Sequence, residues 1–169
     1  TVAALLGPEL CTEDGILTEE GDSVFWDRST LYAMRGIFRA GHADEAASFL
    51  HGLAARRLTG EHVPYFIEAW PEGAGSMRQL SAESGLYCRI FSEGLFGIRP
   101  TGFRSFELTP SLPSDWDRAA LRHIRAFGCD FDIELLRVSP GRLQVTVLRH
   151  GATSKIYTVK SGTSLHIVL

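Results

Sequence analysis

Two carboxylates stand among aromatic residues in the segment 61–80, which reads EHVPYFIEAWPEGAGSMRQL. Glu68 and Glu72 have Tyr65 and Trp70 as near neighbours in the chain. Flat aromatic rings stack on the faces of sugars, and paired carboxylates act on hydroxyl groups and on a glycosidic oxygen. These residue types at this spacing therefore predict a carbohydrate site.

The same segment is expected to be a loop. Four residues that break helices and strands interrupt it, namely Pro64, Pro71, Gly73 and Gly75. A loop between helices is ordinarily polar and only a handful of residues long. An aromatic loop of this length therefore indicates a function, in which Glu72 and Arg78 bind substrate hydroxyls or pair with one another.

Helical periodicity dominates the first part of the chain. Apolar residues recur at helical spacing in Arg28–Ala40 and in His42–Thr59, with Gly41 between the two segments. These two helices are expected to form an αα-hairpin. A third helix is expected over Gln79–Phe96, and its wide apolar face indicates burial on more than one side. Further helices preceding Thr1 would provide that cover.

From Gly102 onward, short segments of alternating polarity and turn residues predict strands. The expected strands are Phe103–Thr109, Ala120–Phe127, Cys129–Val138, Arg142–Arg149, Ser154–Lys160 and Ser164–Leu169. Helices followed by strands indicate an α+β chain. We expect residues 1–101 to be helical and residues 102–169 to form an antiparallel β-sandwich domain.

A series of short motifs spans the change from helices to strands. In order they are Glu68-Ala69-Trp70, Gly97-Ile98, Pro100-Thr101-Gly102-Phe103, Pro110-Ser111-Leu112-Pro113 and Trp116. This order resembles the C-terminal end of the six-hairpin, (α/α)6-barrel glycoside hydrolases, of which the alpha-L-rhamnosidase-like enzymes are the nearest group. The resemblance begins near Phe25 and reaches the C-terminus. It implies helical hairpins from the end of an incomplete (α/α)6 toroid, followed by a C-terminal β-sandwich.

The resemblance further implies hydrolysis of a glycosidic bond with inversion. Inverting enzymes use one carboxylic acid to protonate the leaving oxygen and a second carboxylate, about 6.5–9.5 Å away, to activate water. In the family the glutamate of the Glu-x-Trp motif is the base, which is Glu68 here. The general acid belongs to an earlier part of the barrel. The chain departs from the family at Ala82-Glu83-Ser84, where a polar Asn-His pair is common, and Glu83 is a second catalytic candidate.

Loops that lead into the inner helices of a ring of hairpins meet at one mouth. The segment Glu19–Arg28 leads into the first long helix, and the aromatic loop leads into the third. If these are successive inner helices, Trp26 and Asp27 face the same cleft as Glu68 and Trp70. The residues expected to bind substrate are Trp26, Asp27, Tyr65, Trp70, Glu72 and Arg78.

Each candidate also has a structural interpretation. Asp27 stands where a helix N-cap is expected, and Glu83 lies early in a helix, where the dipole favours an acid. Glu68 fits a solvated loop acid equally well, and the two tryptophans fit core positions. Away from the loops, Glu93 lies in the middle of a helix and is expected to form a buried structural ion pair.

Two other functions fit parts of the chain. Polysaccharide lyases share the toroid-plus-sandwich plan and eliminate across a uronic acid with Tyr and His or Asn, roles that Tyr65 and His62 would take. Alternatively, the strand region is a non-catalytic module that braces a barrel, with Trp116 pinning the linker to it. The barrel-to-sandwich motifs favour a hydrolase fragment that is inactive alone, with a carbohydrate substrate and the remainder of the barrel as partners.

Composition and charge argue against several other classes. The 169 residues have a net charge of −3 without the clustered basic excess of nucleic-acid-binding surfaces. No stretch approaches the roughly 20 apolar residues of a membrane span. Cofactor fingerprints are absent, and neither the three cysteines nor the six histidines have zinc-ligand spacing. We therefore expect no cofactor, metal, nucleic acid or membrane partner; the compartment stays open, with a periplasmic or secreted location favoured.

Overall fold

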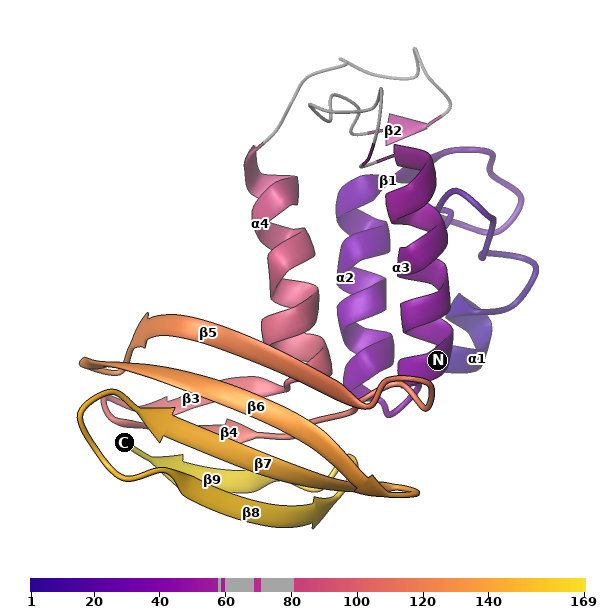
Figure 1. Cartoon of the computed structure of the whole chain (residues 1–169). Coiled ribbons are helices and arrows are strands. Elements are labelled where there is room, and N and C mark those ends of the chain that lie inside the picture. The colour runs from indigo at the N-terminus through magenta and orange to yellow at the C-terminus, as the bar shows by residue number, and fades with distance from the viewer. Residues whose placement is uncertain (58, 60–68, 71–80) are drawn as a thin grey trace.

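The computed structural model describes residues 1–57, 59, 69–70 and 81–169, and these form a mixed α+β fold (Figure 1). The helices are α1 (Val2–Leu5), α2 (Asp27–Arg39), α3 (Ala43–Arg57) and α4 (Ser81–Arg89), and α4 continues into the π-helical segment η2 (Ile90–Leu95). Helix α2 packs against both α3 and α4. The three longer helices stand together on one side of the β-sheets (Figure 1).

Two antiparallel sheets make up the other half. The smaller has the order β3-β4-β9, from β3 (Ile98–Gly102), β4 (Ser105–Leu108) and β9 (Leu165–Val168). The larger has the order β5-β6-β7-β8, from β5 (Arg118–Ala126), β6 (Cys129–Ser139), β7 (Arg142–Arg149) and β8 (Lys155–Lys160). Phe106 of β4 stacks on Phe131 of β6 with ring centroids 5.7 Å apart, so the buried faces of the two sheets meet.

Strand alternation explains why these segments pair as they do. In β7, Leu143, Val145 and Val147 are buried while the residues between them are not. Side chains alternate between the two faces of a strand, so one face of β7 enters the core and the other meets solvent. The strand boundaries expected from the sequence are confirmed to within a few residues, as is the antiparallel pairing.

The turn between β5 and β6 places an aromatic residue in an uncommon backbone conformation. Phe127 and Gly128 form a two-residue loop and have φ angles of +55° and +73°. Two-residue hairpin loops with both φ angles positive match the twist of the flanking strands. Phe127 lacks the freedom of glycine, but its ring stacks on Phe106 with centroids 5.0 Å apart. The stacking offsets the backbone cost.

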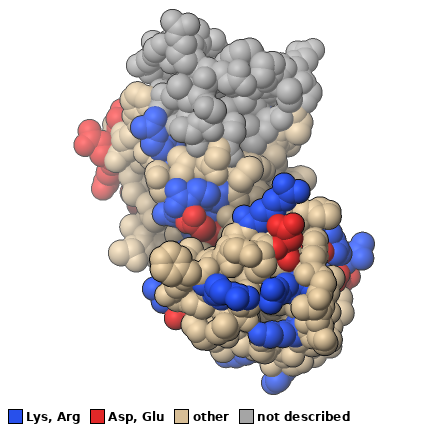
Figure 2. All heavy atoms as spheres, turned by 90° about the vertical axis from the view of Figure 1, so that its left-hand side faces the viewer, with Lys and Arg blue, Asp and Glu red and all other residues tan. Residues whose placement is uncertain are grey.

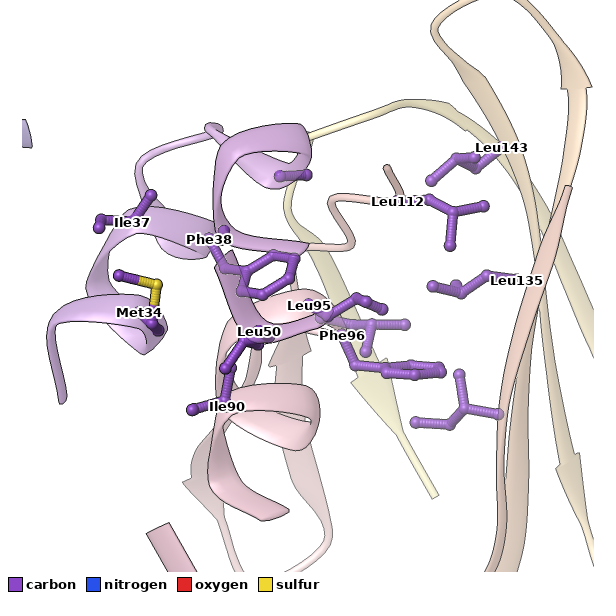
Figure 3. Close-up of a cluster of buried hydrophobic side chains, with 14 of the residues drawn as sticks. Met34, Ile37, Phe38, Leu50, Ile90, Leu95, Phe96, Leu112, Leu135 and Leu143 are labelled. Carbon is purple, nitrogen blue, oxygen red and sulfur yellow. The ribbon is translucent and has the colours of Figure 1, made fainter. Parts of the chain in front are cut away.

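The helices and the sheets share one core. Leu95 and Phe96, at the end of the last helical segment, are buried between Leu50 of α3 and the large-sheet residues Leu135 and Leu143 (Figure 3). The cluster of buried apolar side chains runs without interruption from the helical layer into the space between the sheets. The helical and strand regions are therefore packed as one body in the described residues.

The chain passes from helix to sheet at Gly97. Its φ is +66°, and a Cβ at this position would lie 2.3 Å from the carbonyl oxygen of Thr109. Backbone bonds from Thr109 N to Gly97 O (3.2 Å) and from Ser111 N to Leu95 O (2.8 Å) fasten the following linker against the helix end. Only glycine fits this crossing without displacing the linker.

The observed elements agree with most of those expected from the sequence and differ at a few positions. The α+β class and the αα-hairpin of α2 and α3 are confirmed. Strand β3 and helix α1 were not expected, and the boundary expected between residues 101 and 102 lies within β3. Among the described helices, none has the length and apolar character needed to cross a bilayer.

Charged side chains are spread over the surface. On the face shown in Figure 2, Lys and Arg form several separate groups, with Asp or Glu beside some of them. One pair of opposite charges joins Arg99 of β3 to its register partner Glu107 of β4, with Nε 3.1 Å from Oε2. Such cross-strand pairs add modestly to sheet stability. This face differs from the continuous basic stripe of a nucleic-acid-binding surface.

Phe106→Ala tests whether the contact between the sheets holds the fold. Phe106 is fully buried, so its removal should lower the free energy of unfolding by about 3–5 kcal/mol. Phe103→Ala is the matched control, because Phe103 is 99% exposed and its removal should change stability by no more than about 0.5 kcal/mol. Urea unfolding measures both, and equal effects would contradict the proposed core.

Candidate functional site

A two-residue strand pair brings the two predicted loops together. Strand β1 (Phe25–Trp26) pairs antiparallel with β2 (Ala69–Trp70), so that Phe25 faces Trp70 and Trp26 faces Ala69. The pair lies at the end of the helices that points away from the sheets (Figure 1). The segment that leads into α2 therefore lies directly beside the Ala69-Trp70 part of the Glu-x-Trp motif.

The N-terminal segment fixes β1 in place. Isolated backbone bridges join Cys11 to Ile16 and Leu17 to Phe25, so the chain folds back on itself before α2. Ile16 N donates to the hydroxyl of Thr30, a buried residue of α2, at 2.9 Å. The ring of Phe25 lies against Gly15, where a Cβ would be 2.1 Å from Phe25 Cδ2. This close contact holds Phe25 inward.

Because successive side chains of a strand point to opposite faces, the inward position of Phe25 turns Trp26 outward. Phe25 is 5% exposed and Trp26 is 38% exposed. The core interpretation of Trp26 is therefore wrong, and its ring is accessible at the end of the helices. An exposed tryptophan edge or face of this kind is what stacking on a sugar requires.

Asp27 lies next to Trp26 but is only 3% exposed. The N-cap of α2 is Trp26, with an extended backbone, and Asp27 is the first helical residue. The interpretation of Asp27 as the N-cap is thus corrected by one position. A carboxylate in the first turn is favoured by the positive end of the helix dipole, so Asp27 also stabilises the start of α2.

The other predicted site residues are located only in part. Glu68, Tyr65, Glu72 and Arg78, together with His62, lie outside the described residues. Trp70 is placed by the backbone pairing of β2. The backbone of Glu83 falls in the first turn of α4.

Glu93 forms the structural ion pairs expected of it, although its side chain is 29% exposed rather than fully buried. Its carboxylate accepts from Arg89 Nε at 2.6 Å and from Arg35 Nη1 at 2.7 Å. The hydrogen bond from Arg89, followed by the charges of both arginines, lowers the pKa of Glu93, although partial desolvation opposes the shift. Since Arg35 belongs to α2, the network ties α2 to η2.

The linker before β5 is held through its backbone. Arg137 of β6 donates from Nε to the carbonyl oxygen of Trp116 at 3.1 Å and from Nη2 to that of Pro113. The N–H of Ser114 donates to the carboxylate of Asp44 in α3. Trp116 thus takes part in holding the linker through its backbone carbonyl, together with Arg137 and Asp44.

The ring of Trp116 is 36% exposed and lines a hollow of about 480 Å³ between α3 and the linker. His51 and Asp115 line the same hollow. It lies at the sheet end of the helices, so it is separate from the β1–β2 pair.

A group of chemically active side chains on the large sheet was not foreseen. One ligand-type atom from each of His123, Asp132 and His150 lies within 4.8 Å of the others. Their spacing along the chain follows no zinc motif, because the three residues meet through the pairing of β5, β6 and β7. Knowing which residues form strands is not enough to predict this group. The exact register between the strands is needed as well.

Comparison of the chain with protein-family models, with curated proteins and with solved structures finds no match. The resemblance to six-hairpin glycoside hydrolases rests on the motifs quoted above. The function is therefore inferred from those motifs and from the geometry around β1 and β2.

Gly15→Ala tests how strongly β1 depends on the segment before it. The new methyl group would overlap the ring of Phe25, which should cost about 1–3 kcal/mol of stability. Gly36→Ala is the matched control in α2, where a Cβ meets nothing within 4 Å and should add up to about 1 kcal/mol. Thermal unfolding compares them, and a neutral Gly15→Ala would show that Phe25 is not held as described.

Glu93→Gln tests the network between α2 and η2. Because the folded pKa of Glu93 lies below its ordinary value of 4.5, the ion pairs stabilise the fold above pH 4.5, and this contribution is lost as the pH falls through the folded pKa. The substitution should lower the free energy of unfolding by about 1 kcal/mol at neutral pH. The difference between wild type and variant should be smaller in acid. Urea unfolding at several pH values, with exposed Glu20→Gln as control, measures this; a difference that grew in acid would contradict it.

Proposed function

We propose that this chain is the C-terminal part of an inverting glycoside hydrolase of the six-hairpin, (α/α)6-barrel type, acting on a poly- or oligosaccharide. The observation that carries the proposal is the pairing of β1 with β2. It places the segment before α2 beside Ala69 and Trp70 of the segment before α4, which supports the convergence expected of inner-helix loops at the mouth of a ring of hairpins. The Glu-x-Trp motif lies in the second of these loops.

Glu68 is the proposed general base. It immediately precedes β2, whose Ala69 is the register partner of Trp26. A base on this segment would activate water against the anomeric carbon, while an acid from an earlier barrel helix protonates the leaving oxygen. Glu83 is kept as the alternative base, and the rest of the barrel would come from sequence preceding Thr1.

Substrate binding is assigned to the aromatic and polar residues around this mouth. Trp26 offers an exposed ring on β1, Trp70 lies on the paired strand β2, and Tyr65 precedes Trp70 by five residues in the sequence. Asp27 is buried next to Trp26 in the chain, so its proposed part is to support the shape of the mouth and to contact a substrate hydroxyl only at the edge of the mouth. Glu72 and Arg78 are proposed to bind further hydroxyls.

The sheets are assigned a bracing role. Their two facing layers fit the C-terminal sandwich of the family, and the shared core at Leu95 and Phe96 would transmit rigidity to the last inner helix. A polysaccharide lyase would use the same plan of helices and sheets. The two enzyme classes differ in their products, because hydrolysis adds water and elimination leaves an unsaturated uronic acid.

The test uses the parent protein that contains this segment, on a panel of plant and bacterial glycans. Glu68→Gln should reduce the release of reducing sugar by about 10²- to 10⁴-fold, the usual effect of losing a general base. The matched control is Glu45→Gln, at an exposed position of α3 near the sheets, which should retain activity. Proton NMR of the first product should show inverted anomeric configuration.

Other results would redirect the proposal. Unsaturated uronic-acid products would overturn hydrolysis in favour of a lyase. Hydrolysis that survives Glu68→Gln would overturn the assignment of the base and make Glu83→Gln the next variant. Absence of any glycan-cleaving activity in the parent protein would leave the chain as a structural module and refute the enzyme.

A further inference from the structure

Strand β5 carries a β-bulge opposite Asp132 of β6. The register between the two strands shifts so that two residues, Arg122 and His123, stand where one would ordinarily face Asp132. His123 has a φ of +56°, a left-handed conformation that is uncommon for a residue with a Cβ. Bulges redirect side chains, and backbone strain of this kind gathers at functional sites.

The bulge brings two histidines onto one carboxylate. Asp132 is 9% exposed, and its Oδ1 accepts from His123 N at 2.8 Å. The same oxygen lies 3.3 Å from Nε2 of His150, which directly follows β7. The rings of His123 and His150 meet edge to face, with centroids 5.8 Å apart.

We propose that His123, Asp132 and His150 bind a divalent transition-metal ion such as Zn²⁺. Two imidazole nitrogens and one carboxylate oxygen form a donor set that suits Zn²⁺ and its neighbours in the first transition row. This site lies on the large sheet and is independent of the proposed glycosidase mouth. It leaves positions on the ion for water or an external ligand, as three-ligand sites do.

The distances fit this donor set with little movement. A tetrahedral ion with bonds of about 2.0–2.1 Å holds its ligand atoms roughly 3.3 Å apart. Asp132 Oδ1 and His150 Nε2 are already separated by 3.3 Å, and all three donors lie within 4.8 Å. The remaining approach falls to His123, an exposed side chain that has room to rotate. The carboxylate and His150 therefore form a prepared pair that His123 completes.

Arg122 is the competing cation. Its Nη1 lies 3.5 Å from Asp132 Oδ2 and its Nη2 lies 3.8 Å from Glu134 Oε1. The Arg122 side chain is 55% exposed, so it is free to swing away when an ion binds. If the metal displaces this contact, Arg122→Gln should bind the ion more tightly than the wild type. A carboxylate that served only as acceptor for the bulge N–H would not respond in this way.

The experiment titrates the full chain with Zn²⁺ by calorimetry and with Co²⁺ by visible absorption. The wild type should bind one equivalent of Zn²⁺, and His150→Ala and His123→Ala should each weaken binding at least tenfold. Asp132→Asn should do the same while its amide oxygen still accepts the bulge N–H, which keeps the fold. His166→Ala, at an exposed histidine of β9, is the matched control and should bind normally.

Three results would overturn the site. In the first, the wild-type protein does not bind one equivalent of Zn²⁺ at saturation. In the second, His150→Ala binds Zn²⁺ with the same affinity as His166→Ala. In the third, the Co²⁺ spectrum contains a thiolate-to-Co²⁺ charge-transfer band. That band would assign the ion to one of the free thiols Cys11, Cys88 or Cys129. Unfolding curves of each variant show whether a loss of binding accompanies an intact fold, and Asp132→Asn decides the matter if a histidine variant unfolds.

Discussion

The structure depends on how the last helix enters the β-sheets. Leu95 and Phe96 are buried among side chains of both halves, and Gly97 crosses Thr109 too closely for any side chain. The backbone bond from Ser111 to Leu95 closes this junction. Since close-packed interiors resist displacement, the helices cannot shift over the sheets without opening the core that both share. The sheets therefore help to fix the position of the opposite end of the helices.

The helices carry this restraint on their position from the sheets to the β1–β2 pair. Glu93, two residues before Leu95, binds Arg35 of α2 and Arg89 of α4, so the helices that follow the two loops are fixed to one another. Rigid helices transmit that spacing to their far ends, where Phe25 packs on Gly15 and β1 meets β2. The outward position of Trp26 thus depends on the packing of Phe25 against Gly15, at the far end of helices that Glu93 fixes to one another.

Periodicity in the sequence was sufficient for the long helices and for most strands, because burial of one face imposes a regular pattern on each. It failed for β3, whose Pro100 and largely exposed residues carry no alternation. It also failed for β1 and β2, which are too short to show a period. That the segment before α2 lies beside Ala69-Trp70 was expected from the ring of hairpins that the resemblance implies, whereas the burial of Asp27 has no local signal.

The histidine pair on the large sheet shows the limit of pattern analysis most clearly. Alternation assigns each strand residue to one face of the sheet, but one extra residue in β5 changes the face to which the neighbouring residues of that strand are assigned. Only the register reveals that His123 reaches Asp132 and His150. An ion held there would link β5, β6 and the end of β7, and binding to the folded state alone would stabilise that sheet. A bracing sheet and a metal site are therefore compatible roles, since an ion that stiffens the sheet also stiffens the core beneath the helices.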